Sequence, residues 1–226
     1  MLEYGIVVRH IDTNDVTTKH IELMKQHNPN VPIETISGNI PFKDGLAAKK
    51  LHDLNDIWQR VAINKNKAWQ NCDLLNYLWW LNKKNNCKKW VLLEADVRCN
   101  MNLKEFWGDN WNDPFVVAGR AGITDGEWYW KKEYNNLPES YKPFYTGIMP
   151  FTVILIDDIV LAKMVELLQK EFVSVFCEVR FPTLANRVGY PPKGFSNYQG
   201  NISFQKLESN IDVTQKGLWH PVKKWI

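Results

Sequence analysis

Several features that define other protein classes are missing from this 226-residue sequence. No apolar run approaches the roughly 20 residues that a membrane-spanning helix needs. The longest run, Met149–Ile156, contains a Pro and a Thr, and Glu3 and Arg9 interrupt the short apolar start. We therefore expect no signal peptide, no transmembrane segment and a cytoplasmic location. Lys and Asn are abundant, which is typical of proteins from AT-rich genomes, viral or bacterial. If the protein is viral, the expected location is the host cytoplasm.

Cysteine patterns that build disulfide frameworks or zinc sites are also missing. No Cys-x-x-Cys pair occurs, and no His stands at zinc spacing from a cysteine. We expect free and mostly buried thiols in a reducing compartment. The four cysteines are Cys72, Cys87, Cys99 and Cys177.

The net charge of +3 is too small to indicate a nucleic-acid partner, and none is expected. No Gly-rich phosphate fingerprint follows the first β-branched run, which argues against a Rossmann dinucleotide site. What the sequence does contain is an excess of tryptophan, with 11 residues. Such an excess suggests flat ligands such as sugar rings or bases, although many of these rings will simply pack in the core.

The apolar pattern predicts an α/β fold. A strand over Tyr4–Arg9, a helix over residues 17–26 and a strand over residues 31–37 form a β-α-β unit, which favours a right-handed crossover and a parallel sheet. We predict one domain over residues 1–226, with a mostly parallel central sheet flanked by helices. Further helices are predicted over residues 50–60, 67–84 and 103–107, after Asp157 or Asp158 as a cap, and from Pro182; further strands over residues 90–94, 115–119, 144–156 and 202–207.

The stretch Lys88–Asn100, K-K-W-V-L-L-E-A-D-V-R-C-N, has the clearest chemical signal. Its apolar run predicts a buried strand that ends at Glu94. Asp96 lies two residues further, on the same side of an extended backbone. Ligands of open α/β sheets bind at the carboxyl ends of strands, and carboxylates are ligands for Mg²⁺ and Mn²⁺. The pair therefore predicts a metal site, although E-x-D also fits two solvated acids at a strand edge.

Two further groups could take part in chemistry. In W-H-P-V-K near the C-terminus, His220 could supply a metal ligand and Lys223 could neutralise a phosphate; the alternative is a frayed terminus with an exposed His. In F-C-E-V-R-F-P-T-L-A, Glu178 follows an apolar run and precedes a predicted helix, a suitable place for a general base. The alternative for Glu178 is a salt bridge with Arg180.

The order and spacing of these pieces resemble the nucleotide-sugar glycosyltransferases with the GT-A fold. The likeness depends on the opening β-α-β unit, L-L-E-A-D, Y-T-G-I-M-P, E-V-R-F-P-T-L and W-H-P-V-K. It covers nearly the whole chain as a pattern, and no single motif is highly specific. It implies a GT-A-like fold and transfer of a hexose-type sugar from a nucleotide-diphosphate donor, with a UDP-sugar favoured, to a hydroxyl of a glycan acceptor.

The resemblance also implies roles for single residues. Asp96 would be the direct ligand of Mn²⁺ or Mg²⁺, and His220 would complete the metal shell. Glu94 stands where Asp is more usual, and its longer side chain would reach the ion, the ribose or a metal-bound water. Glu178 would deprotonate the acceptor in an inverting reaction. The donor would be contacted by Val8, Arg9, His10, Glu94, Ala95 and Lys223.

Other functions fit parts of the pattern. A glycoside hydrolase could use Glu94 and Glu178 without a metal. A carbohydrate-binding protein could use the tryptophans, among which W-Y-W at residues 128–130 and the pair Trp107 and Trp111 could stack on sugar faces. A metal-dependent nucleotidyltransferase would share the acid pair. The sequence does not define the oligomeric state.

Overall fold

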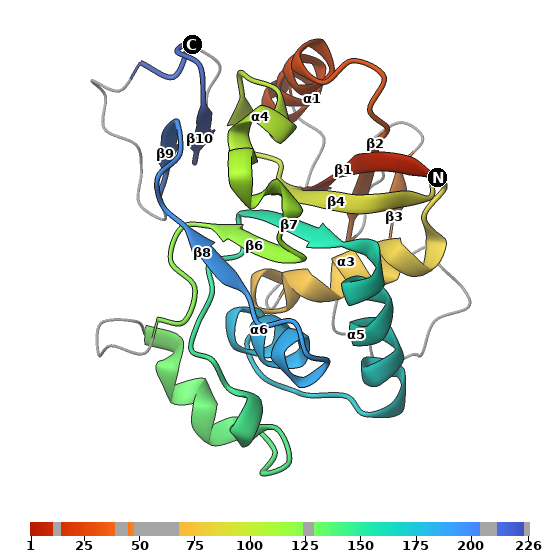
Figure 1. The fold of residues 1–226 in the computed structure, drawn as a ribbon, viewed down its shortest axis with the longest axis vertical. Coiled ribbons are helices and arrows are strands. Elements are labelled where there is room, and N and C mark those ends of the chain that lie inside the picture. The colour runs from red at the N-terminus through yellow and green to blue at the C-terminus, as the bar shows by residue number, and fades with distance from the viewer. Residues whose placement is uncertain (11–14, 39–44, 48–67, 124–128, 204–211, 224–226) are drawn as a thin grey trace.

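The computed structural model describes residues 1–10, 15–38, 45–47, 68–123, 129–203 and 212–223 (Figure 1). Its centre is a seven-stranded sheet of order β3-β2-β1-β4-β7-β6-β8. Strand β7 runs antiparallel to both of its neighbours, whereas the other pairs are parallel. The predicted α/β fold with a mostly parallel central sheet is confirmed. The strands are β1 (Leu2–His10), β2 (Ile33–Ser37), β3 (Leu46–Ala47), β4 (Cys87–Glu94), β6 (Phe115–Ala118), β7 (Val153–Asp157) and β8 (Lys193–Phe195).

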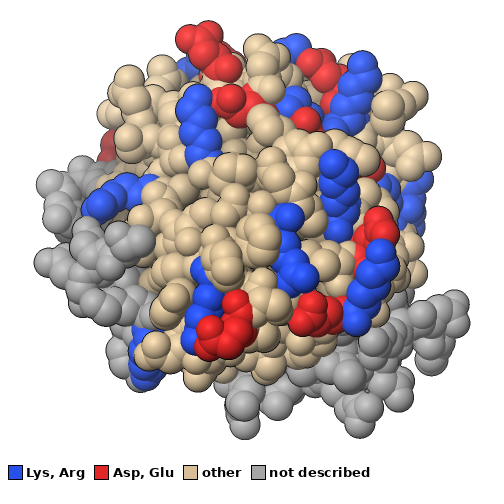
Figure 2. All heavy atoms as spheres, turned by 60° about the horizontal axis from the view of Figure 1, so that its bottom comes forward, with Lys and Arg blue, Asp and Glu red and all other residues tan. Residues whose placement is uncertain are grey.

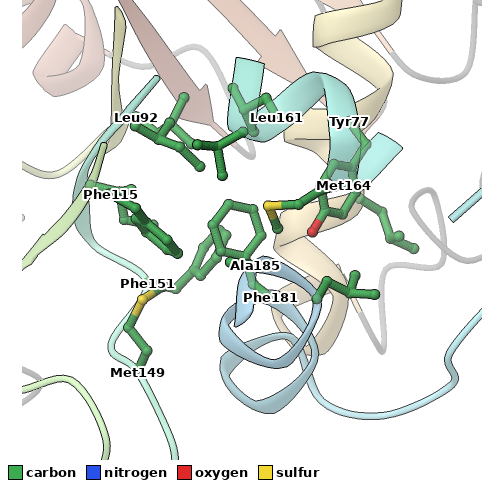
Figure 3. Packing of buried hydrophobic residues seen from close by; sticks show 14 of the residues in the cluster. Tyr77, Leu92, Phe115, Met149, Phe151, Leu161, Met164, Phe181 and Ala185 are labelled. Atoms are coloured by element: carbon green, nitrogen blue, oxygen red, sulfur yellow. The ribbon is translucent and has the colours of Figure 1, made fainter. Parts of the chain in front are cut away.

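Helices cover both faces of this sheet (Figure 1). They are α1 (Asp15–His27), α3 (Cys72–Asn82), α4 (Leu103–Trp107), α5 (Asp158–Lys170) and α6 (Cys177–Arg187). Alternate residues of a strand point to opposite faces. Leu92 of β4 packs with Tyr77 of α3 and Phe181 of α6 in one core cluster (Figure 3). Its neighbour Val91 packs with Ile21 of α1 in the second cluster.

The opening β-α-β unit is present as predicted. Strands β1 and β2 are parallel, with Ile6 opposite Ile33, and α1 connects them. Strand β1 also pairs in parallel with β4. Because the two strands end together, Arg9 lies opposite Glu94 at the carboxyl edge of the sheet.

Three predicted elements around the main sheet need correction. The helix predicted over residues 50–60 lies outside the described residues. The helix predicted over residues 67–84 begins as a 3-10 turn, η2 (Ala68–Asn71), before α3. Of the strand predicted over residues 144–156, only β7 is regular. Before it, Gly147 has a φ of 94°, and a Cβ there would lie 2.6 Å from the carbonyl carbon of Gly122. A glycine at this position therefore permits a close approach of the two backbones.

The third correction concerns α6, which begins at Cys177 rather than at Pro182. Proline has no N–H, so Pro182 cannot donate to the carbonyl four residues earlier, which belongs to Glu178. The N–H of Met149 donates to that carbonyl instead, at 3.0 Å. Glu178 thus lies in the first turn of the helix, and its backbone is joined to the segment that leads into β7.

The acids at the start of α5 also differ from the prediction. Asp157 is the N-cap residue, but its side chain makes no capping hydrogen bond. Its carboxylate pairs with Lys89, and Asp158 accepts from the indole N–H of Trp80 at 2.9 Å and of Trp90 at 2.8 Å. These contacts give both acids a structural role away from the carboxyl edge of the sheet.

All four cysteines are free thiols; three are buried and Cys72 is half-buried, as expected for cysteines that pack rather than bind metal. No helix in the described part of the chain is long and apolar enough to cross a membrane.

Charged side chains of both signs are interspersed on the face of the molecule seen in Figure 2. Exposed pairs such as Lys170 and Glu166 of α5 contribute little to stability, because water screens them and both side chains lose freedom.

A buried ion pair joins α6 to α3. The Nε of Arg180 donates to Asp73 at 2.8 Å, and both side chains are fully buried. The same guanidinium donates to Asn71 at 3.1 Å and to the carbonyl of Val175 at 2.7 Å. Such a network leaves the guanidinium well compensated, but only while the carboxylate is present.

We predict that Asp73→Asn lowers the free energy of unfolding by about 3–5 kcal/mol, because it leaves a buried guanidinium without its counter-charge. Urea unfolding followed by circular dichroism measures this loss. Glu166→Gln, which breaks an exposed pair, is the control and should leave the midpoint unchanged. Equal midpoints for the two variants would contradict the role given to the buried pair.

Candidate active site

The acid pair lies where β4 ends: Glu94 is the last residue of the strand, and Asp96 is in the turn that follows. The N–H of Glu94 donates to the carbonyl of Thr152 at 3.1 Å. The N–H of Ala95 donates to the carbonyl of Arg9 at 2.9 Å. Asp96 follows in the turn, so the backbone is not extended here as the sequence suggested. We call residues 94–96 the acid turn; its two carboxylates converge because the chain bends.

A second, small sheet brings the C-terminal histidine to the acid turn. Its strands, in the order β5-β10-β9, are β5 (Arg98–Cys99), β10 (Leu218–His220) and β9 (Gly200–Ile202). Leu218 pairs with Cys99 just after the acid turn, and the N–H of Val222 donates to the carbonyl of Asp96 at 2.9 Å. His220 is 6% exposed, so it is not part of a frayed terminus. Of the strand predicted over residues 202–207, only Ile202 belongs to β9, and residues 204–207 lie outside the described part.

Two carboxylates and one imidazole meet at this point. The Nε2 of His220 lies 3.2 Å from Glu94 Oε2 and 3.3 Å from Asp96 Oδ1. One ligand atom from each of the three residues lies within 4.8 Å of the others. The structure thus brings together the residues that the sequence suggested as metal ligands, and the Nζ of Lys223 pairs with the second oxygen of Asp96.

Charge compensation governs the pKa values in this cluster. Burial alone raises the pKa of Asp96, but hydrogen bonds and charge from His220 and Lys223 outweigh it and hold the pKa well below its usual range. Burial lowers the pKa of His220, but Asp96 and Glu94 outweigh it and raise the pKa to about 9. An imidazolium and an ammonium therefore balance the carboxylates of the acid turn.

The donor set fits a divalent cation. Carboxylate oxygens suit Mg²⁺ and Mn²⁺, and an imidazole nitrogen adds a ligand that transition metals accept well. The Nδ1 of His220 lies 2.6 Å from the carbonyl of Ser203, which can only accept a hydrogen bond. Nδ1 therefore carries a proton, and Nε2 faces the acids. A cation that binds here would displace the Nε2 proton of the imidazolium, because only a neutral imidazole is a ligand.

The residues at the end of β1 lie next to the acid turn. The guanidinium of Arg9 lies 4.4 Å from the ring centre of Phe151 and donates to its carbonyl. The same guanidinium is 4.0 Å from Glu94 Oε1. His10 ends the strand and is buried, whereas Val8 is buried in the core cluster that packs on α1.

Glu178 is connected to this site through a short piece of chain. Its carbonyl accepts from Met149, and the carbonyls of Phe151 and Thr152 accept from Arg9 and Glu94. The Glu178 side chain is mostly buried, at 8% residue exposure. The guanidinium of Arg180, its suggested salt-bridge partner, is bound instead by Asp73, as described above.

The tryptophans proposed for sugar stacking are placed differently. Trp107, the last residue of α4, and Trp111 are buried in the second core cluster, so core packing accounts for both side chains. Trp128 and the side chains of Tyr129 and Trp130 lie outside the described residues.

One contact to the acid turn has no counterpart in the sequence analysis. His20 of α1 is fully buried, and its Nδ1 lies 2.9 Å from the carbonyl of Ala95. The signal available in the sequence was a histidine beside apolar residues on a predicted helix, with Ile21 and Met24 following it. Such a histidine gives no hint of its partner.

No family model and no curated protein sequence matches this chain. Solved structures do. The glycosyltransferase GlyE of Streptococcus pneumoniae TIGR4 is 13% identical, with a TM-score of 0.42 over 85% of this chain and 45% of GlyE, so this chain spans less than half of that protein.

Two further solved structures are similar to this chain to a comparable degree. LgtC, described as a galactosyltransferase in complex with donor and acceptor sugar analogues, is 11% identical, with a TM-score of 0.41 over 79% of this chain and 70% of LgtC. Mouse xyloside xylosyltransferase 1 is 8% identical, with a TM-score of 0.47 over 86% of this chain and 85% of that protein. At these values the likenesses carry no argument about activity, which is argued below from the site.

We predict that the protein binds Mn²⁺ and that Asp96→Asn weakens this binding by more than about 100-fold, because even partners of ligands change metal affinity by about 10–100-fold. Calorimetric titration with Mn²⁺ alone measures the affinity. Glu166→Gln, far from the acid turn on α5, is the matched control and should bind as the wild type does. Unchanged affinity in Asp96→Asn would contradict the assignment.

Proposed function

We propose that this protein is a metal-dependent glycosyltransferase. It transfers a hexose-type sugar from a nucleotide-diphosphate donor, with a UDP-sugar favoured, to a hydroxyl of a glycan acceptor. The observation that carries the proposal is the cluster of Glu94, Asp96 and His220 at the carboxyl edge of a mostly parallel sheet. Ligands of such sheets bind at this edge, and the donor set suits Mn²⁺ or Mg²⁺.

The cluster is suited to a diphosphate leaving group. A bound divalent cation supplies Lewis-acid stabilisation of the negative charge that develops on the departing phosphate. Asp96 and His220 hold this cation, and Glu94 is its third ligand or holds the ribose. Lys223 has an exposed side chain that pairs with Asp96 and can turn to the phosphate oxygens as a point charge.

The nucleotide binds along the ends of β1 and β4 in this proposal. Arg9 and His10 end β1, next to Glu94 and Ala95 of the acid turn. The Nε and Nη1 atoms of Arg9 are buried without a hydrogen-bond partner among the described residues. Buried donors of this kind are costly unless a ligand or water satisfies them, which supports a polar ligand beside Arg9. Val8 contributes through its backbone, because its side chain is in the core.

Glu178 acts as the general base. As the acceptor oxygen forms its bond to the anomeric carbon, the bond from that carbon to the phosphate oxygen breaks, and the acceptor proton passes to the Glu178 carboxylate. Attack from the face opposite the leaving group inverts the anomeric centre. The position of Glu178 in the first turn of α6, tied through Met149 to the segment beside Arg9 and Glu94, supports this role.

Donor binding is expected to depend on the metal. A saturating UDP-sugar should raise the unfolding temperature in the presence of Mn²⁺ and not in its absence, since a ligand at 100 times its Kd adds about 2.7 kcal/mol to the native state. Thermal shift measurements over a panel of UDP- and GDP-sugars check this. A protein that responds to no nucleotide sugar, but to free glycans, would instead be a hydrolase or a carbohydrate-binding protein.

Glu178→Gln should keep donor binding and lose transfer by about 10²–10⁴-fold, the usual contribution of a general base. Product formation from a responding donor is followed by mass spectrometry, and donor affinity by the same thermal shift. Glu105→Gln, an exposed acid in the first turn of α4, is the matched control and should transfer normally. If Glu178→Gln remains as active as this control, another group is the base.

A further inference from the structure

A histidine of helix α1, which packs on one face of the sheet, contacts the acid turn. His20 of α1 is fully buried, and its Nδ1 lies 2.9 Å from the carbonyl oxygen of Ala95. Ala95 is the residue between Glu94 and Asp96. The contact joins residues that are 75 positions apart in the sequence, so it forms only when α1 packs on the sheet.

The backbone partners of the acid turn show why this contact is distinct. The N–H of Ala95 donates to Arg9, and the carbonyl of Asp96 accepts from Val222, both at 2.9 Å. These are contacts between backbone groups, which a change of side chain leaves in place unless proline replaces the donor residue. The hydrogen bond to the Ala95 carbonyl comes from a side chain, that of His20. A single substitution can therefore remove it.

The chemistry of the contact fixes the tautomer of His20. A carbonyl oxygen can only accept, so Nδ1 must carry the proton. Burial lowers the pKa of His20, with the nearby charge of Arg98 acting in the same direction, while Asp96 and the hydrogen bond to Ala95 act in the other. Ile21 and Met24, on the same helix, are also buried and belong to the second core cluster.

We propose that His20 is a positioning residue for the metal centre, and this rests on the proposed function. The Ala95 carbonyl and the Asp96 N–H belong to one planar peptide unit. A hydrogen bond that fixes the carbonyl therefore fixes the plane from which the Asp96 side chain departs. Metal ligands need to be held within about 0.5 Å of the productive geometry. His20 holds the Asp96 carboxylate in the direction of His220 Nε2, 3.3 Å away in this structure.

Two amide variants separate the hydrogen bond from mere packing. In His20→Asn the amide nitrogen is the same number of bonds from Cα as Nδ1 is, so it can still donate to Ala95. In His20→Gln the amide nitrogen is one bond further, in the position of Nε2, and cannot donate along the same direction. Both variants are polar, uncharged and smaller than or similar to histidine in volume, which makes them a matched pair.

The experiment is a calorimetric titration of wild type, His20→Asn and His20→Gln with Mn²⁺ alone, together with thermal unfolding without metal. We expect His20→Asn to stay within about 3-fold of the wild-type affinity and His20→Gln to lose about 10-fold, the lower end for groups that orient metal ligands. Equal affinity of His20→Gln and wild type would overturn the proposal. An equal loss in both variants would overturn it too, because only packing would then matter.

The outcome is separable from the proposed function. If the wild type binds Mn²⁺ and a nucleotide sugar but His20→Gln binds both equally well, only the role of His20 is rejected. If the wild type binds no Mn²⁺, the metal centre itself is rejected and His20 loses its role with it. Should either variant fail to fold, nitrogen-15 spectra of the wild-type histidines decide: we expect His20 to be protonated at Nδ1, and a proton at Nε2 alone would overturn the proposal.

Discussion

Mutual compensation of charge at the end of β4 is the constraint on which the rest of this structure depends. Glu94 and Asp96 are brought together by a turn, and two carboxylates so close need a cation between them. His220 supplies it, with Lys223 on the outer side. The small sheet of β5, β10 and β9 delivers that histidine, and the pairing of β1 with β4 places Arg9 on the other side of Glu94.

The supports of the site come from both faces of the sheet. On one face, the ion pair of Arg180 with Asp73 joins α6 to α3. Arg180 lies two residues after Glu178, so the same contact also fixes the helical turn that carries the proposed base. On the other face, α1 carries His20 to the acid turn. The missing N–H of Pro182 frees the Glu178 carbonyl for a bond to the chain that enters β7. Stability and proposed chemistry thus share the same few contacts.

The sequence predicted the parts of the site that lie at the ends of long elements. An apolar strand followed by Glu94 and Asp96 has a clear pattern, and the β-α-β unit follows from its β-branched runs. The strands β5 and β10 have only two and three residues, too few for an alternating pattern. The pairing that buries His220 was therefore not predictable, although the residue was suggested both by its chemistry and by the resemblance. The partner of His20 is set by helix packing over a long sequence separation, which local patterns do not record.

The most direct test of the account is a crystal of the protein soaked in Mn²⁺ and measured at a wavelength where manganese scatters anomalously. The account predicts one anomalous peak between the Asp96 carboxylate and His220 Nε2, with Lys223 displaced from Asp96. A map without a peak at this place, in which His220 still lies between Glu94 and Asp96 at saturating Mn²⁺, would contradict it. In that case the three residues would be a structural ion cluster.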